Sequence, residues 1–214
     1  MSPRSARPHI VSVLALVLVL TLFPGRVEAD NGVVLPLLEE FASEVSNGEA
    51  GSLRGIYVPE VFASRIVLQP KDDPTFVSSE EGALTEFALA HQVGSTGLLA
   101  HNYLAGRNFS KVKQDQVFYL VYGDGRTEAY IVTEVMRYKA LDPQSVWSYF
   151  VDLRHGNLVS ASRLFSDVYG EPGRVVLQTC IFAAGDASWG RLFIIAEPFE
   201  VNLVGAPEKT GSLD

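Results

Sequence analysis

A strand, turn and strand pattern between residues 116 and 135 constrains this chain more than any other feature. Residues 116–122 and 128–135 are rich in β-branched and aromatic side chains, and Gly123-Asp124-Gly125-Arg126 separates them. An Asp-Gly turn between two such runs is the strongest short-range signal of a β-hairpin. The centre of the chain is therefore predicted to be antiparallel sheet.

Other short apolar runs extend the same pattern along the chain, and prolines or glycines bound most of them. They cover residues 55–58, 64–68, 97–101, 175–180 and 191–196. Many short strands with few helices are typical of a sheet that closes on itself. The sequence predicts a mainly β fold, a closed or nearly closed barrel of about eight strands with a few short helices.

Two segments have helical features. Residues 33–45 carry apolar side chains at near-helical spacing and end before Asn47-Gly48, a good stop signal. Residues 78–89 are predicted to form a short helix, because Ser78 and Glu81 have capping-box spacing. Between 141 and 173 the β pattern lapses, and a segment of that length is expected to be a functional loop with some structure of its own.

The N-terminus has the pattern of an export signal. Arg4 and Arg7 precede a mostly apolar stretch at 10–23, and Val27-Glu28-Ala29 fits a cleavage site. The apolar stretch has about 14 residues, short of the roughly 20 needed to span a membrane. A cleaved signal is therefore preferred to a retained anchor, which would associate the protein with the membrane. The predicted divisions are a signal peptide at 1–29, a lead-in helix or linker at 30–52, a catalytic domain at 53–200 and a C-terminal tail at 201–214.

Cleavage would leave about 185 residues, enough for one substantial core. Removing three arginines and one glutamate from the 17 basic and 25 acidic residues leaves 14 and 24, a net charge near −10. This charge disfavours a nucleic-acid partner. The acidic residues are spread along the chain, as expected of a solvated surface.

Cys180, the only cysteine, closes the run 175–180 and has no internal disulfide partner. Arg191 opens the next run, and His101 ends the run 97–101. A thiolate is the nucleophilic form of cysteine, a histidine can transfer its proton, and an arginine suits a carbonyl oxygen that becomes negative. Singly, each residue has an ordinary structural explanation. Together in this order, in an exported chain, they indicate a cysteine acyl-transfer enzyme.

These residues also carry a family resemblance. Leu177-Gln178-Thr179-Cys180 followed by Arg191 resembles the sortase signature, in which a Thr-Leu-x-Thr-Cys strand precedes an arginine on the neighbouring strand. Val176 stands in place of the first threonine and is expected to point away from the thiol. Gly97-Leu98-Leu99-Ala100-His101-Asn102, with Gly106, is similar to the family's histidine segment. The resemblance runs from about residue 56 to 198 and indicates no particular class.

The resemblance implies a β-barrel cysteine transpeptidase at the outer face of the membrane, in the cell wall or secreted. Cys180 would attack a sorting-signal peptide of the Leu-Pro-x-Thr-Gly kind in a surface protein, His101 would protonate the departing amine, and Arg191 would stabilise the oxyanion. An amine of the cell wall, a pilin or another protein would then resolve the thioester. Further contacts to the peptide are expected from Thr179, Leu177, Asn102 and Trp189.

By the same resemblance, residues 141–173 are expected either to line a peptide groove or to form a packed lid. No cofactor is expected. One cysteine and four scattered histidines disfavour a zinc site, and no acidic cluster has a calcium-loop arrangement. Two alternatives stay open. One is an L,D-type peptidoglycan transpeptidase, which would need a Ser-His-Gly-Cys-like segment, and the other is a non-catalytic β-barrel module that binds peptides.

Overall fold

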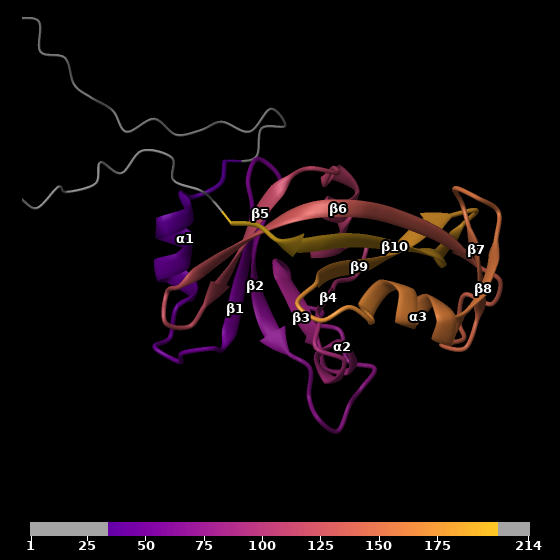
Figure 1. Cartoon of the computed structure of the whole chain (residues 1–214), viewed down its shortest axis with the longest axis horizontal. Helices are drawn as coiled ribbons and strands as arrows, with labels where there is room; N and C mark the ends of the chain where they lie inside the picture. The colour runs from indigo at the N-terminus through magenta and orange to yellow at the C-terminus, as the bar shows by residue number, and fades with distance from the viewer. Residues whose placement is uncertain (1–33, 201–214) are drawn as a thin grey trace, which may run out of the picture.

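The computed structural model describes residues 34–200 (Figure 1). The predictions for the signal at 1–29 and the tail at 201–214 lie outside the described residues. In chain order the elements are α1 (Leu38–Val45), β1 (Leu53–Val58), β2 (Phe62–Leu68), β3 (Ala83–Phe87), α2 (Ala88–Gln92), β4 (Thr96–Leu99), the 3₁₀-helix η1 (Ala105–Lys111), β5 (Val117–Tyr122), β6 (Thr127–Ala140), β7 (Tyr149–Asp152), β8 (Leu158–Ser160), α3 (Ala161–Tyr169), β9 (Val175–Ala183) and β10 (Asp186–Pro198).

The strands form one sheet that closes on itself. The order is β10-β9-β4-β3-β2-β1-β5-β6-β7-β8, and a further pairing of β10 with β6 closes an eight-stranded barrel. Strands β7 and β8 continue from β6 beyond the barrel, at the right of Figure 1. The pairs β2–β3 and β4–β9 are parallel, and the other pairs are antiparallel. The predicted mainly β fold with a closed barrel of about eight strands is confirmed.

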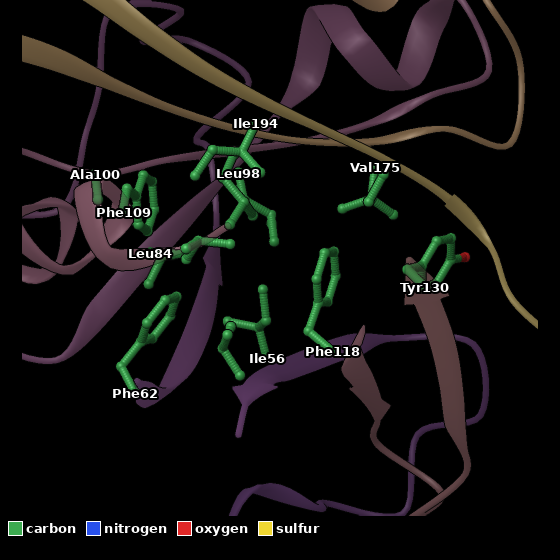
Figure 2. Close-up of a cluster of buried hydrophobic side chains, with 14 of the residues drawn as sticks. Ile56, Phe62, Leu84, Leu98, Ala100, Phe109, Phe118, Tyr130, Val175 and Ile194 are labelled. Carbon is green, nitrogen blue, oxygen red and sulfur yellow. The ribbon is translucent and has the colours of Figure 1, made fainter. Parts of the chain in front are cut away.

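Along each strand, side chains point alternately into the barrel and away from it, and the inward ones fill the interior. In β9, Val175 and Leu177 belong to the interior cluster, whereas Val176 belongs to a second cluster on the outer face. Figure 2 shows the interior side chains, among them Ile56 and Phe118, converging from several strands. Since successive side chains of a strand point to opposite faces, this alternation assigns every residue of β9 to one side of the sheet.

Helices α1 and α3 pack against the outside of the barrel. Leu164, Val168 and Tyr169 of α3 pack in the second cluster with Phe193 and Ile195 of β10. The predicted lead-in helix forms as α1, but it is part of the domain, because Phe41 and Ala42 pack against Val121 of β5.

The helix predicted for residues 78–89 is wrong. Residues 83–87 form β3, and only Ala88–Gln92 is helical. Ser78 caps no helix, because residues 79–82 are not helical; its Oγ accepts the N–H of Glu80 at 3.2 Å. β3 pairs with β2 on one side and β4 on the other, and this pairing outweighs the local helical preference.

The predicted central hairpin is confirmed as β5–β6 with its turn at 123–126. The last hairpin is longer than predicted, because β9 continues to Ala183 and β10 begins at Asp186. Cys180 and Arg191 therefore lie within strands and not at their ends. Residues 141–173 carry structure of their own, as predicted, in the form of β7, β8 and α3.

Candidate active site

Cys180 and Arg191 lie directly opposite each other in the antiparallel pair β9–β10. Direct partners in such a pair have Cα atoms about 4.5–5.5 Å apart and project side chains from the same face. The shared face is the outer one, since Leu177 and Leu192, each of the opposite parity, face the barrel interior. Cys180 is a half-buried free thiol on this face. The expectation that Val176 points away from the thiol is wrong, because it lies on the same face of β9, buried with residues of α3.

His101 is brought beside Cys180 by the parallel pairing of β4 and β9. Leu99 pairs with Gln178, so two further residues along both chains place His101 level with Cys180. The N–H of Ala100 donates to the Gln178 carbonyl at 3.2 Å, which carries the pairing past the end of β4. Ala100 packs in the barrel interior, and His101, the next residue, is half-buried.

A buried side-chain hydrogen bond fixes this arrangement. Thr179 Oγ1 donates to the carbonyl of Ala100 at 2.8 Å, joining the residue before the thiol to the residue before the imidazole. Thr179 is only 4% exposed, so the bond is shielded from water. His101, two residues past the end of β4, is thereby held alongside β9, the strand that carries Cys180.

The turn after His101 contributes Gly106, which the sequence named only as part of the resemblance, and Tyr103, which it did not single out. The His101 carbonyl accepts N–H donors from Leu104 at 3.0 Å and Gly106 at 3.1 Å. A Cβ at Gly106 would lie 2.4 Å from Thr179 Oγ1 and 2.7 Å from the His101 carbonyl oxygen, so only glycine fits there. The imidazole of His101 stacks on Tyr103, with ring centroids 5.1 Å apart and an interplanar angle of 20°. The aromatic residue two positions after the histidine was the available sequence signal.

The Arg191 guanidinium joins β10 to one other segment. Its Nη1 donates to the carbonyls of Ser188 and Gly190, each at 2.9 Å, and its Nη2 donates to the carbonyl of Pro143 at 3.4 Å. Pro143 belongs to the loop between β6 and β7. Arg191 therefore holds this loop beside the outer face of the thiol strand.

The four expected peptide contacts have different surroundings. Leu177 is fully buried in the barrel interior, and Thr179 faces the same side, so both support the site from within. Neither offers surface to a peptide. Asn102 Nδ2 donates to the carbonyl of Ala187 at 2.8 Å and joins the histidine segment to the β9–β10 hairpin. The Trp189 ring lies 5.8 Å from Lys139 Nζ, at the border of β10 and β6.

A hollow lies in the segment that Arg191 contacts. Its volume is about 410 Å³, and its lining consists of Leu141, Asp142, Ser145, Trp147, Ser148, Tyr149 and Leu158. Trp147 is 76% exposed and Leu158 is 59% exposed. A cluster of exposed apolar side chains is typical of a binding surface.

Within residues 34–200, no group of three or more histidine, cysteine, aspartate or glutamate side chains is arranged to hold a metal ion. None of the helices in this part of the chain is long and apolar enough to span a membrane.

Among solved structures, the chain is similar to sortase A from Corynebacterium diphtheriae. The two share 16% sequence identity at a TM-score of 0.50, and the match covers 73% of this chain and 65% of that one. The chain has a sortase-like fold. It is also similar to sortase C1 from Streptococcus suis, with 14% identity and a TM-score of 0.46, over 76% of this chain and 78% of that one. Sortase C-1 from Actinomyces oris gives 15% identity and a TM-score of 0.47, over 81% and 84%.

At these identities the likeness concerns the sortase-like fold and assigns no sortase class. No protein-family description matches the chain, and no curated protein matches it in sequence.

Proposed function

We propose that this chain is an exported sortase-like cysteine transpeptidase that cleaves a sorting signal through a thioester on Cys180. One observation carries the proposal: Cys180 and Arg191 are direct partners in the pair β9–β10, and the parallel pairing of β4 with β9 brings the segment that carries His101, two residues past the end of β4, alongside the thiol strand. A nucleophile, a proton carrier and a permanent cation at neighbouring positions are the groups that acyl transfer requires.

In the first half-reaction the Cys180 thiolate attacks the carbonyl carbon of the signal's threonine, in the peptide bond that follows this residue. The carbonyl oxygen becomes negative, and free N–H groups of Arg191 stabilise it. The C–N bond then breaks, His101 gives a proton to the departing amine, and a thioester remains on Cys180. In the second half-reaction an amine attacks the thioester, His101 takes its proton, and the thiolate is released.

The apolar hollow next to Pro143 is the proposed binding site for the signal peptide. Arg191 Nη2 contacts the carbonyl of Pro143, which directly follows Asp142 of the hollow, and Arg191 is the direct strand partner of Cys180, so this guanidinium is proposed to link the hollow to the thiol. A short extended peptide could then place its apolar residues in the hollow and its scissile carbonyl beside Arg191. Asn102, which joins the histidine segment to the hairpin tip, is proposed to line the other side.

The proposed location is the outer face of the membrane or the cell wall, where surface proteins or pilins supply both the signal and the amine. This part of the proposal rests on the export pattern of residues 1–29.

Intact-mass spectrometry of the mature protein, incubated with a pool of Leu-Pro-x-Thr-Gly-like peptides, tests the proposal. We expect a peptide adduct on Cys180 that hydroxylamine releases. The Cys180→Ala variant should form none, and Arg191→Ala should form it much more slowly. Peptide binding without any adduct across the pool would instead favour the non-catalytic peptide-binding module.

A further inference from the structure

The imidazole of His101 has an unusual orienting partner for a proposed proton carrier. Catalytic histidines are commonly oriented by a third group, often a carboxylate. The structure contains such a pair elsewhere, since His155 Nδ1 lies 2.7 Å from Asp152 Oδ2. Among the described residues no carboxylate bonds to His101 in this way, and the contact that its ring makes is with Tyr103.

The geometry of the turn fixes the two rings against each other. Both backbone bonds to the His101 carbonyl, from Leu104 and Gly106, close the chain around Tyr103. The rings are nearly parallel, at 20°, with centroids 5.1 Å apart. This separation is within the range of favourable offset stacking.

Burial in the core does not explain this aromatic side chain. Tyr103 is 63% exposed, whereas the tyrosines that pack in the barrel, such as Tyr130 at 8%, are nearly inaccessible. Its ring covers one face of the imidazole at the rim of the site. Rotation of the imidazole about its Cα–Cβ bond would break this stack.

We propose that Tyr103 is a positioning residue that holds the His101 imidazole toward Cys180 by ring stacking. The inference rests on the proposed function for its catalytic consequence. Proton delivery to a departing amine needs the imidazole within hydrogen-bond reach. A freely rotating ring would spend only part of its time there, so the stack raises the fraction of productive encounters without touching the peptide.

The test compares Tyr103→Phe, which keeps the ring, with Tyr103→Leu, which removes it. Phe199→Leu is the control, because it makes the same kind of change at a partly exposed aromatic residue after the far end of β10. At saturating peptide, Tyr103→Leu should slow thioester formation about 2- to 13-fold, the range of one aromatic pair, with KM unchanged. Tyr103→Phe and the control should keep the wild-type rate.

A second measurement reports the position of the imidazole independently of the reaction. The ring protons of His101 in a proton–carbon NMR spectrum should carry an upfield ring-current shift in the wild type and in Tyr103→Phe, and should lose it in Tyr103→Leu. The proposal is overturned if the shift is the same in all variants, or if Tyr103→Leu changes KM alone, which would make Tyr103 a peptide contact. A wild type that forms no thioester would sink the proposed function, and the NMR comparison would still decide whether Tyr103 holds the ring.

Discussion

Replacing Thr179 with valine should weaken both the fold and the site. Thr179 Oγ1 donates to the Ala100 carbonyl at 2.8 Å, and the two residues are 4% and 6% exposed. Valine has nearly the same shape, so the change removes the hydroxyl donor and leaves little cavity. The buried carbonyl of Ala100 then loses this partner.

The expected size follows from that loss. Leaving a buried acceptor unsatisfied costs about 1–3 kcal/mol of the free energy of unfolding. For a domain of this size each kcal/mol lowers Tm by about 2–4 °C, so a loss near 2 kcal/mol predicts a fall of about 4–8 °C. Because Ala100 directly precedes His101, thioester formation should also slow by about tenfold or more at temperatures where the variant stays folded.

Urea denaturation and intact-mass kinetics, run on the same preparations, measure the two effects. Thr133→Val is the matched control, because Thr133 Oγ1 donates to the Ile195 carbonyl at 3.4 Å in a half-buried position. That bond is long, so its loss should cost no more than about 0.5 kcal/mol. If Thr179→Val were as stable and as active as Thr133→Val, the buried bond would not be what holds the histidine segment to the thiol strand.

Three further changes test other parts of the molecule. Gly106→Ala forces a Cβ against backbone and hydroxyl oxygens, so it should lower the free energy of unfolding by about 1–3 kcal/mol and suppress thioester formation. The control Gly156→Ala, in open space at φ 75°, should lower it by about 1–2 kcal/mol and leave thioester formation unchanged. Trp147→Ala should raise the peptide KM several-fold at unchanged Tm, and Leu68→Ala, 64% exposed on β2, should change neither. Burial opposes ionisation of Glu128, but hydrogen bonds from two tyrosines and an arginine outweigh it and lower the carboxyl pKa below its ordinary 4.5. The stabilisation of the folded state by these bonds is present above pH 4.5 and is lost as the pH falls through the folded-state pKa. Denaturation curves of Glu128→Gln should therefore show a smaller fall in stability on acidification than those of the wild type. An equal fall in stability on acidification in both proteins would contradict this explanation.

Sequence patterns predicted the barrel well where strands pair with their neighbours along the chain. The β5–β6 hairpin was readable because an Asp-Gly turn lies between two β-type runs. Residues 83–87 were misread as helix because their strand identity depends on β2 and β4, which lie on either side of them in the sheet. Capping-box spacing at Ser78 is a local signal, and it could not report that sheet context.

The residues proposed for the chemistry were chosen from the sequence, whereas the residues that hold them in place were not. The order of His101, Cys180 and Arg191 predicted acyl transfer, which stays a proposal, and the sheet register pairs Cys180 directly with Arg191. The assignment of Leu177 to the peptide followed from its place beside the thiol in the sequence. Strand alternation turns Leu177 toward the barrel interior. The contact of Tyr103 with His101 depends on the conformation of a turn, which sequence spacing alone does not fix.

The bond between Thr179 and Ala100 joins residues 79 positions apart in the chain. β4 and β9 run parallel, so no tight turn can bring them together, and β9 fits between β4 and β10 in the closed barrel. Contacts of such long range form late in folding, since the entropy of closing the intervening loop must be overcome first. A chain emerging N-terminus first presents its histidine segment long before its cysteine strand. The three residues therefore come together only as the barrel closes, whereas Cys180 and Arg191, on the two strands of one hairpin, can pair before that.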